Sequence, residues 1–271
     1  MYASFESNHS KLKIDSGQPN KLKIIKRYGT ALFGKSMLNE AINILPHLPD
    51  TDSLDEIRSF LRANLHFNAE QTRQRYANYI IKRMFPFGYA DKPLRLFAKA
   101  YPGSQYLKDA CFYRFMLVEP LVSELIEELF MPNISEGSIP RERIRNYLKD
   151  KYPSSNSITE CNQAFIDTLK SGGIAAADAK NVSFALRDIH IKSFAFILHS
   201  EFPEPGMYNI KELEENRYVK AMLWNPGQIV NALYELRNLG LFNKISEIDG
   251  IRQFTTKHTL SGTVEFLIGG N

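Results

Sequence analysis

The amino-acid sequence predicts a mainly α protein, in which a helical N-terminal bundle is followed by two winged-helix-like units with short β-hairpins. Apolar residues recur at helical spacing from residue 36 to about residue 130. Beyond the break at MPNISEGSIP, helices alternate with short strand-like stretches. The order helix, helix, Leu-Gly-Leu, hairpin near the C-terminus is that of a winged helix.

Length and composition restrict the class of protein. The chain has 271 residues, 44% hydrophobic and 24% charged, which is typical of a soluble globular protein of one to three domains. A mainly disordered chain, a collagen-like chain and a disulfide scaffold are excluded. No stretch approaches the roughly 18 uncharged apolar residues of a membrane span, and the start MYASFESNHS lacks the apolar region of a signal peptide. Since the only two cysteines fit a reducing compartment, we expect a cytoplasmic protein without membrane association.

The charge is distributed unevenly along the chain. Residues 1–100 contain 16 Lys and Arg against 9 Asp and Glu, a net charge of +7, whereas the remainder contains 18 against 21, a net charge of −3. This asymmetry suggests a polyanionic partner near the N-terminal third. An ordinary solvated surface would have the same composition.

The N-terminal part divides into a loosely ordered basic arm, residues 1–20, and a helical domain, residues 21–135. Ser53 and Asn68 are predicted N-caps, with Glu56 and Gln71 three residues after them as in a capping box. The predicted helices cover residues 36–46, 54–66, 69–84, 92–100, 104–117 and 120–130.

Two winged-helix-like units follow, at residues 136–203 and 204–271. In the second unit Gly240 is the predicted residue beyond a helix end, and Asp249-Gly250 the predicted two-residue hairpin turn. For the first unit we predict helices over 140–151, 157–170 and 193–202 and a strand over 181–192. For the second unit we predict helices over 210–223 and 226–238 and strands over 244–248 and 251–255.

Residues Gly29–Ser36 match G-x-x-x-x-G-K-S, the phosphate-binding P-loop. The bulky Leu32 and Phe33 stand where the backbone should wrap around phosphates, and the chain lacks the alternating strands and helices of a parallel sheet. The interpretation we favour is that Leu32, Phe33 and Leu38 are core residues and that Lys35 is exposed.

Catalytic and metal-binding motifs are lacking elsewhere in the sequence. The six histidines have no ligand spacing, and there is no C-x-x-C, G-x-S-x-G or H-E-x-x-H. Paired acids such as Glu127-Glu128 are typical of solvated helix faces. We therefore expect neither an enzyme nor a bound cofactor or metal.

The helix predicted at Glu70–Met84 carries the candidate DNA-binding residues. Gln71, Arg75, Asn78 and Lys82 form a line opposite the apolar side of this helix, uninterrupted by an acid. Cations can bind phosphate or guanine and amides can bind adenine edges, so the line suits double-stranded DNA. A plain solvated helix face remains the alternative. The basic segment before it adds four candidate residues: Lys21, Lys23, Lys26 and Arg27.

The helices that would be recognition helices in the winged-helix-like units carry acids. Glu160 and Asp167 lie on the outward face of helix 157–170, and Glu235 lies on that of helix 226–238 with Gln228, Asn231 and Asn238. Phosphates repel carboxylates. These units are therefore interpreted first as scaffold or protein-contact modules.

The order of segments resembles a known family. A basic start leads into YGTALFGKSMLNEAINIL, then FNAEQTRQRYANYIIKRMF, VEPLVSELIEELF, FIDTLKSGGI and NALYELRNLGLFNKISEIDGIRQFT. This layout, over residues 22–260, is similar to the BrxA family of the BREX phage-defence systems, once labelled inner-membrane proteins. The resemblance implies a mostly helical, non-enzymatic DNA-binding protein that works with other phage-defence components. It also implies that Gly29–Ser36 is a segment entering a helix.

Three functions follow from these observations. The first is a DNA-binding accessory protein of phage defence that contacts the duplex through its basic N-terminal third. The second is an interaction scaffold whose winged helices recruit proteins without DNA affinity. The third is a nucleotide-binding protein that uses Gly29–Ser36.

Overall fold

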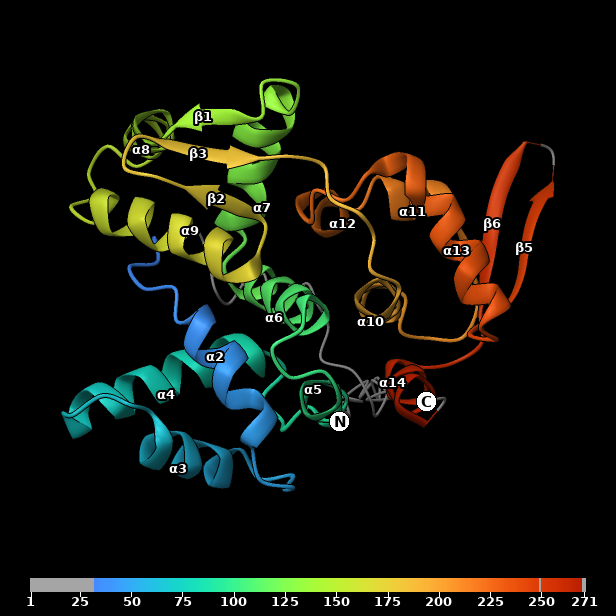
Figure 1. Ribbon diagram of the computed structural model, residues 1–271, viewed down its shortest axis with the longest axis horizontal. Coiled ribbons are helices and arrows are strands. Elements are labelled where there is room, and N and C mark those ends of the chain that lie inside the picture. Colours follow the sequence, from blue (N-terminus) through green and yellow to red (C-terminus); the bar gives the residue numbers. More distant parts are fainter. Residues whose placement is uncertain (1–31, 249, 270–271) are drawn as a thin grey trace, which may run out of the picture.

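The computed structural model describes residues 32–248 and 250–269, and these residues form a mainly α protein with two small antiparallel sheets. Figure 1 shows two halves side by side, one built from α2 to α9 and the other from α10 to α14. The predicted fold class is confirmed. None of the described helices is long and apolar enough to cross a membrane.

The N-terminal helices pack around α6, whose residues from Ala110 to Val118 are all buried. Ser53, Asp91 and Ser104 cap α3, α5 and α6, each accepting a hydrogen bond from a backbone N–H three residues on. The helices are α2 (Leu38–Ile44) with a 3₁₀ turn (Leu45–His47), α3 (Leu54–Asn64), α4 (Glu70–Met84), α5 (Lys92–Ala100) and α6 (Gln105–Val118).

The start of α4 differs from the prediction. Asn68 does not cap this helix; the N-cap position is Ala69, which offers no side-chain acceptor. Arg73 holds the loop before the helix instead. Its Nη1 donates hydrogen bonds to the carbonyl oxygens of Phe67 and Asn68 at 2.7 and 2.9 Å. A side chain from the first turn thus fixes the loop, which the sequence pattern alone did not indicate.

The first three-stranded unit follows α6 directly. Its sheet has the order β1-β3-β2, with every neighbouring pair antiparallel. Gly173, at φ 66°, ends α9 two residues later than predicted. The elements are α7 (Leu121–Leu125) with a π-helical turn (Ile126–Phe130) and a 3₁₀ turn (Met131–Asn133), β1 (Ser138–Pro140), α8 (Arg141–Lys151), α9 (Ile158–Gly172), β2 (Ala175–Ala177) and β3 (Asn181–Phe184).

The second three-stranded unit repeats the strand arrangement of the first, with two short helices in place of α8 and an additional helix after the last strand, and its sheet, β4-β6-β5, is likewise antiparallel. Gly240 adopts φ 86° just past α13, as predicted. The elements are α10 (Ile191–Glu201), β4 (Met207–Asn209), α11 (Ile210–Glu214), α12 (Arg217–Ala221), a 3₁₀ turn (Pro226–Gln228), α13 (Ile229–Asn238), β5 (Phe242–Ile248), β6 (Ile251–Thr256) and α14 (Leu260–Gly269).

Two predicted elements are wrong in extent. The helix predicted at 210–223 is divided into α11 and α12, because the Asn216 side chain accepts hydrogen bonds from Tyr218 N and Val219 N and so begins a new helix. The strand predicted at 181–192 ends at Phe184. Beyond it, Arg187 forms an isolated parallel bridge with Trp224, so this segment links the two units.

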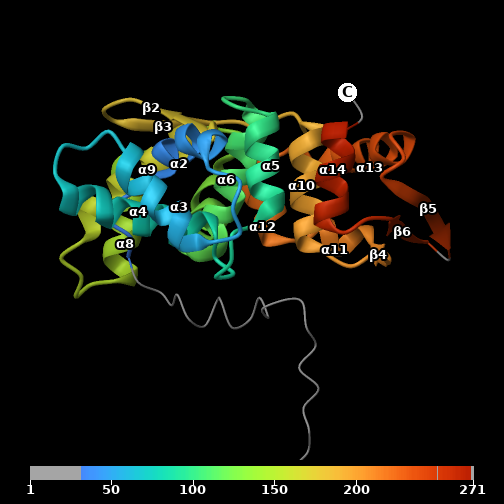
Figure 2. The same cartoon turned by 90° about the horizontal axis from the view of Figure 1, so that it is seen from below.

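The two halves share one hydrophobic core. α10 packs against α6, and α14 packs against both α5 and α10. Figure 2 shows α5 of the first half side by side with α10 and α14 of the second, where the two halves meet. The linker, which is the segment between β3 and α10, is held against α6 by the buried residue Asp109. Asp109 Oδ1 accepts a hydrogen bond from Arg187 Nη2 of the linker at 2.7 Å, and Asp109 Oδ2 accepts one from Ser193 Oγ of α10 at 2.8 Å.

Candidate nucleic-acid interface

Helix α4 presents the predicted polar line to solvent. Ala77, Ile80 and Met84 are buried on its inner side against the N-terminal bundle. Gln71, Arg75 and Asn78 are exposed. The amphipathic pattern therefore oriented this helix correctly.

The fourth residue of the line, Lys82, is in a different environment. Its side chain is 40% exposed, and its Nζ lies 3.9 Å from Glu119 Oε1. Glu119 follows α6 in the chain, so the helix pattern gave no sign of an acid at this place. The polar line thus contains no acid of its own but has one beside its C-terminal end, which weakens the field that Lys82 presents to an anion.

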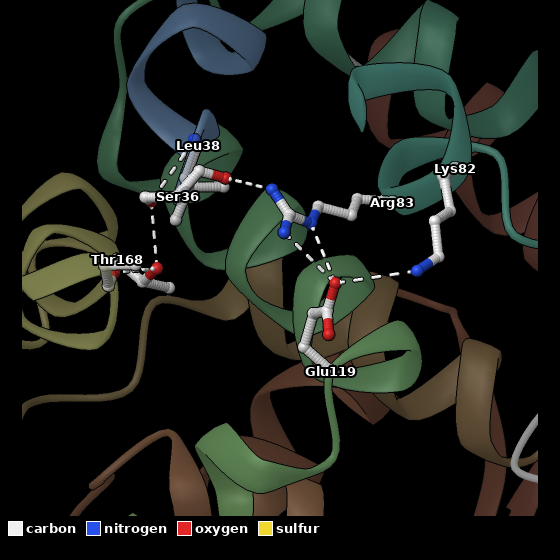
Figure 3. A network of polar contacts seen from close by, with 7 residues as sticks. Ser36, Leu38, Lys82, Arg83, Glu119 and Thr168 are labelled. Atoms are coloured by element: carbon white, nitrogen blue, oxygen red, sulfur yellow. Dashed lines mark hydrogen bonds and ion pairs between the residues drawn. The ribbon is translucent and has the colours of Figure 1, made fainter. Parts of the chain in front are cut away.

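Lys82 stands at the edge of a buried polar network centred on Arg83 (Figure 3). Arg83 Nε and Nη2 each lie 3.1 Å from Glu119 Oε1, and Nη1 donates to the Ser36 carbonyl oxygen at 2.6 Å. The Arg83 guanidinium also lies 4.5 Å from the ring centroid of Phe115. Burial lowers the pKa of Arg83, and the charge and hydrogen bonds of Glu119 oppose that shift. The network joins α4, the end of α6 and the segment before α2.

The residues of the P-loop match that the structure describes have other partners. The Ser36 hydroxyl accepts hydrogen bonds from Thr168 Oγ1 at 2.9 Å and from Leu38 N at 3.4 Å (Figure 3). Phe33 and Leu38 are buried, Leu32 is partly buried and Lys35 is exposed. A side chain added at Gly34 would meet the Glu160 side chain at the start of α9. An acid at that position repels a phosphate, so these contacts favour a structural role for the segment.

A cleft brings Lys35 together with the α4 face. Lys35, Arg75 and Lys82 line it from two segments far apart in the sequence. Glu119 and Glu160 line the same cleft, so its charge is mixed. The sequence pattern predicts only that Lys35 is exposed. Its place in the same cleft as Arg75 depends on tertiary packing and has no local signal in the sequence.

Lys21, Lys23, Lys26 and Arg27, the other predicted DNA-binding residues, lie outside the described residues.

On the outward face of α9, the Gln163 side chain forms hydrogen bonds with Arg141 and Asp167. These partners leave the Gln163 amide less available to a base edge.

Gln228, which precedes α13, is also engaged. Its side chain accepts from Ile189 N at 3.0 Å and donates to Asp188 Oδ1 at 2.8 Å. It therefore positions the linker between the two units. Asn231, on the outward face of α13, is exposed.

Comparison with known proteins decides the family. A family model described as BrxA matches residues 26–193, more than half of the chain. The chain belongs to the BrxA family. The BrxA match covers the described helices α2 to α9 and the first three-stranded unit and ends just inside α10, so nearly all of the second unit lies beyond it. No curated protein and no solved structure matched the chain. Membership of the BrxA family supports a role as a component of BREX phage defence.

Proposed function

We propose that this chain is a non-enzymatic, DNA-binding component of a BREX phage-defence system that works in the cytoplasm, and that α4 contacts the duplex. The observation that carries the proposal is the exposure of Gln71, Arg75 and Asn78 in one row on α4. The helix buries its other side in a bundle, so the row is held rigidly. The family match and the net charge of +7 on residues 1–100 support a polyanionic partner.

The dimensions of the row suit a DNA groove. From Gln71 to Lys82 a helix rises about 16 Å, the length of roughly five base pairs at 3.4 Å each. The major groove is about 12 Å wide and admits an α-helix. Arg75 is placed to meet phosphate or guanine, and Asn78 to meet an adenine edge. Lys35 extends the positive surface from the neighbouring segment.

We further infer that the two three-stranded units are winged helices that serve first as protein-contact modules. Each begins with a helix and a strand, continues with two helices, the first of which is divided into α11 and α12 in the second unit, and then has two further strands, with the first strand beside the third. The helices in the recognition position carry Glu160, Asp167 and Glu235 outward, which disfavours phosphate contact. In the second unit, the exposed Tyr234 and Leu239 of the α13 region offer apolar surface to a protein partner.

The DNA proposal is tested by the salt dependence of binding to a duplex of random sequence. Each cation that leaves a phosphate lowers the magnitude of the slope of log K against log salt by about 0.9. We expect Arg75→Ala to lower it by about 0.9 and Arg75→Ala with Lys35→Ala by up to about 1.8. Both residues are exposed, so the fold should be unaffected. Lys82 is left out of this design, because its removal also disturbs Glu119.

The matched control is Lys220→Ala, which removes one exposed cation from α12 in the second unit. It should leave the slope unchanged, as should Asn231→Ala. If the α4 variants bind with the affinity and slope of the natural chain while Lys220→Ala or Asn231→Ala weakens binding, the interface lies in the second unit and the α4 proposal is wrong.

Asn78 is expected to affect sequence preference and leave the salt slope unchanged. An Asn that pairs with an adenine edge discriminates against other bases by about 1–3 kcal/mol. Asn78→Ala should therefore narrow the difference in affinity between the preferred duplex and a scrambled one, as measured by competition binding at fixed salt. Asn231→Ala, which removes an exposed Asn amide from α13 in the second unit, is the control. An equal loss of affinity for all sequences after Asn78→Ala would contradict a base contact.

A further inference from the structure

The cleft beside α4 combines groups of opposite charge. Its volume is about 370 Å³, and Lys35, Arg75 and Lys82 line it as cations suited to a DNA backbone. Glu119 and Glu160 line it as carboxylates, which repel phosphates. Figure 3 shows the contact of 3.9 Å between Lys82 and Glu119. A ligand that suits the whole cleft must carry negative charge at one place and hydrogen-bond donors at another.

The two carboxylates of the cleft differ in their partners. Glu119 is nearly inaccessible to solvent and pairs with Arg83 at 3.1 Å. Glu160 lies in the first turn of α9, is exposed, and has no hydrogen-bond or ion-pair partner among residues 32–248 and 250–269. Glu160 is therefore the acceptor that remains available to a ligand. Because an ionised carboxylate only accepts hydrogen bonds, the ligand must donate them.

Apolar surface lies beside these charges. Leu32, Phe33 and Tyr79 line the same cleft, and Leu32 and Tyr79 are half-buried. An engineered cavity of about 150 Å³ holds benzene, so the cleft has room for a larger ring system with a phosphate group. Proteins bind an unpaired nucleotide through apolar contact with the base, hydrogen bonds to its edge and cations at its phosphates. The lining of the cleft supplies all of these groups.

The available carboxylate of Glu160 favours one base over the others. Guanine presents adjacent N–H donors, N1–H and N2–H, which can pair with both oxygens of a carboxylate. Thymine has a single N–H donor on the corresponding edge. In a paired duplex the guanine donors are engaged by cytosine, so only an unpaired guanine offers them to a protein. The cost of removing a base from the stack is also smallest for a base that is already unpaired.

We propose that the cleft receives an unpaired guanine of a DNA duplex bound to α4. Glu160 accepts hydrogen bonds from N1–H and N2–H of the base, and Lys35 and Arg75 bind the adjoining phosphates. Arg75 and Lys82 belong both to the polar row of α4 and to the lining of the cleft, so a nucleotide of a duplex on the row adjoins the cleft. This role of the cleft rests on the proposed DNA binding by α4, and it specifies the DNA structure that this face prefers.

The test compares duplexes of the same sequence, one fully paired and one with a single extra, unpaired guanine. Their affinities for the full-length protein are measured by fluorescence anisotropy at fixed salt. We expect the bulged duplex to bind at least about tenfold more tightly, because a bidentate contact with the correct base discriminates to that extent. An unpaired thymine should lose most of this preference, and an unpaired hypoxanthine, which lacks the 2-amino group of guanine, should lose part of it.

Glu160→Gln tests the acceptor, because the amide keeps one acceptor oxygen and loses the charge. We expect the preference for unpaired guanine to fall below about threefold. The fully paired duplex should bind at least as tightly as it does to the natural chain, because a carboxylate that repels phosphates is gone. Glu160 is exposed, so the fold should be unaffected. Glu142→Gln, which removes an exposed carboxylate from α8 outside the cleft, is the matched control and should retain the full preference.

The outcomes separate this role of the cleft from DNA binding itself. Equal binding of the bulged and the paired duplex would overturn it while DNA binding by α4 stands, and binding of neither duplex would overturn both. A preference for unpaired guanine that survives Glu160→Gln would trace it to the flexibility of the bulge and reject the contact with Glu160. Guanosine monophosphate that binds as tightly as the bulged duplex would identify a free nucleotide as the ligand, which also contradicts the proposal.

Discussion

Replacing Asp109 by alanine is expected to lower the free energy of unfolding by about 3–5 kcal/mol. Asp109 is fully buried in α6, and its carboxylate is the partner of Arg187, whose side chain is only 14% exposed. It also accepts from Gln105 Nε2 at 2.9 Å. Removing the carboxylate leaves a poorly solvated guanidinium and releases the linker from α6. Urea unfolding followed by circular dichroism measures the loss.

Two further variants make the Asp109 result specific. Asp109→Asn keeps the size and one acceptor but removes the charge, so its cost should be intermediate. Asp150→Ala removes an exposed carboxylate from α8 and should change the stability by less than about 0.5 kcal/mol. If Asp109→Ala were no more destabilising than Asp150→Ala, the carboxylate would not be what holds the linker.

The sequence was informative wherever local interactions decide the structure. Ser53 caps α3 through Glu56 N as the capping-box pattern indicates, and Gly240 takes the positive φ that ends a helix. α14 was missed because its sequence, LSGTVEFLIG, contains two glycines and β-branched residues, which give a weak helix pattern. Its position is determined by packing, including the hydrogen bond from Tyr101 Oη to the Leu267 carbonyl oxygen.

The candidate site could be predicted only in part for the same reason. Periodicity within α4 oriented Arg75 and Asn78 toward solvent. It could not reveal that Glu119, 36 residues after Arg83, approaches the helix or that Lys35 lines the same cleft as Arg75. Arg83 did leave a signal, because a charge between Ile81 and Met84 interrupts an apolar face and such a charge needs a buried partner. The identity of that partner, Glu119, depends on the tertiary structure and cannot be predicted from the local sequence.

The second large effect is expected from Glu119→Ala, which should lower the free energy of unfolding by about 3 kcal/mol. Arg83 is 5% exposed, and Glu119 is the acid with which it pairs. Without Glu119, the guanidinium keeps the Ser36 carbonyl oxygen and the aromatic face of Phe115, neither of which neutralises its charge. Urea unfolding of Arg83→Met, of Glu119→Leu and of the variant with both substitutions gives a double-mutant cycle.

The double variant distinguishes an unpaired charge from lost packing. An ion pair replaced by apolar residues of similar volume is often close to neutral in stability, so Arg83→Met with Glu119→Leu should recover most of the loss seen in Glu119→Ala. Glu124→Ala is the control, because its carboxylate is 26% exposed, and it should cost less than Glu119→Ala. A Glu119→Ala cost below about 1 kcal/mol would indicate that water reaches Arg83. The same variant should strengthen DNA binding by the α4 face, since it removes the acid beside Lys82 while every exposed cation of the row remains.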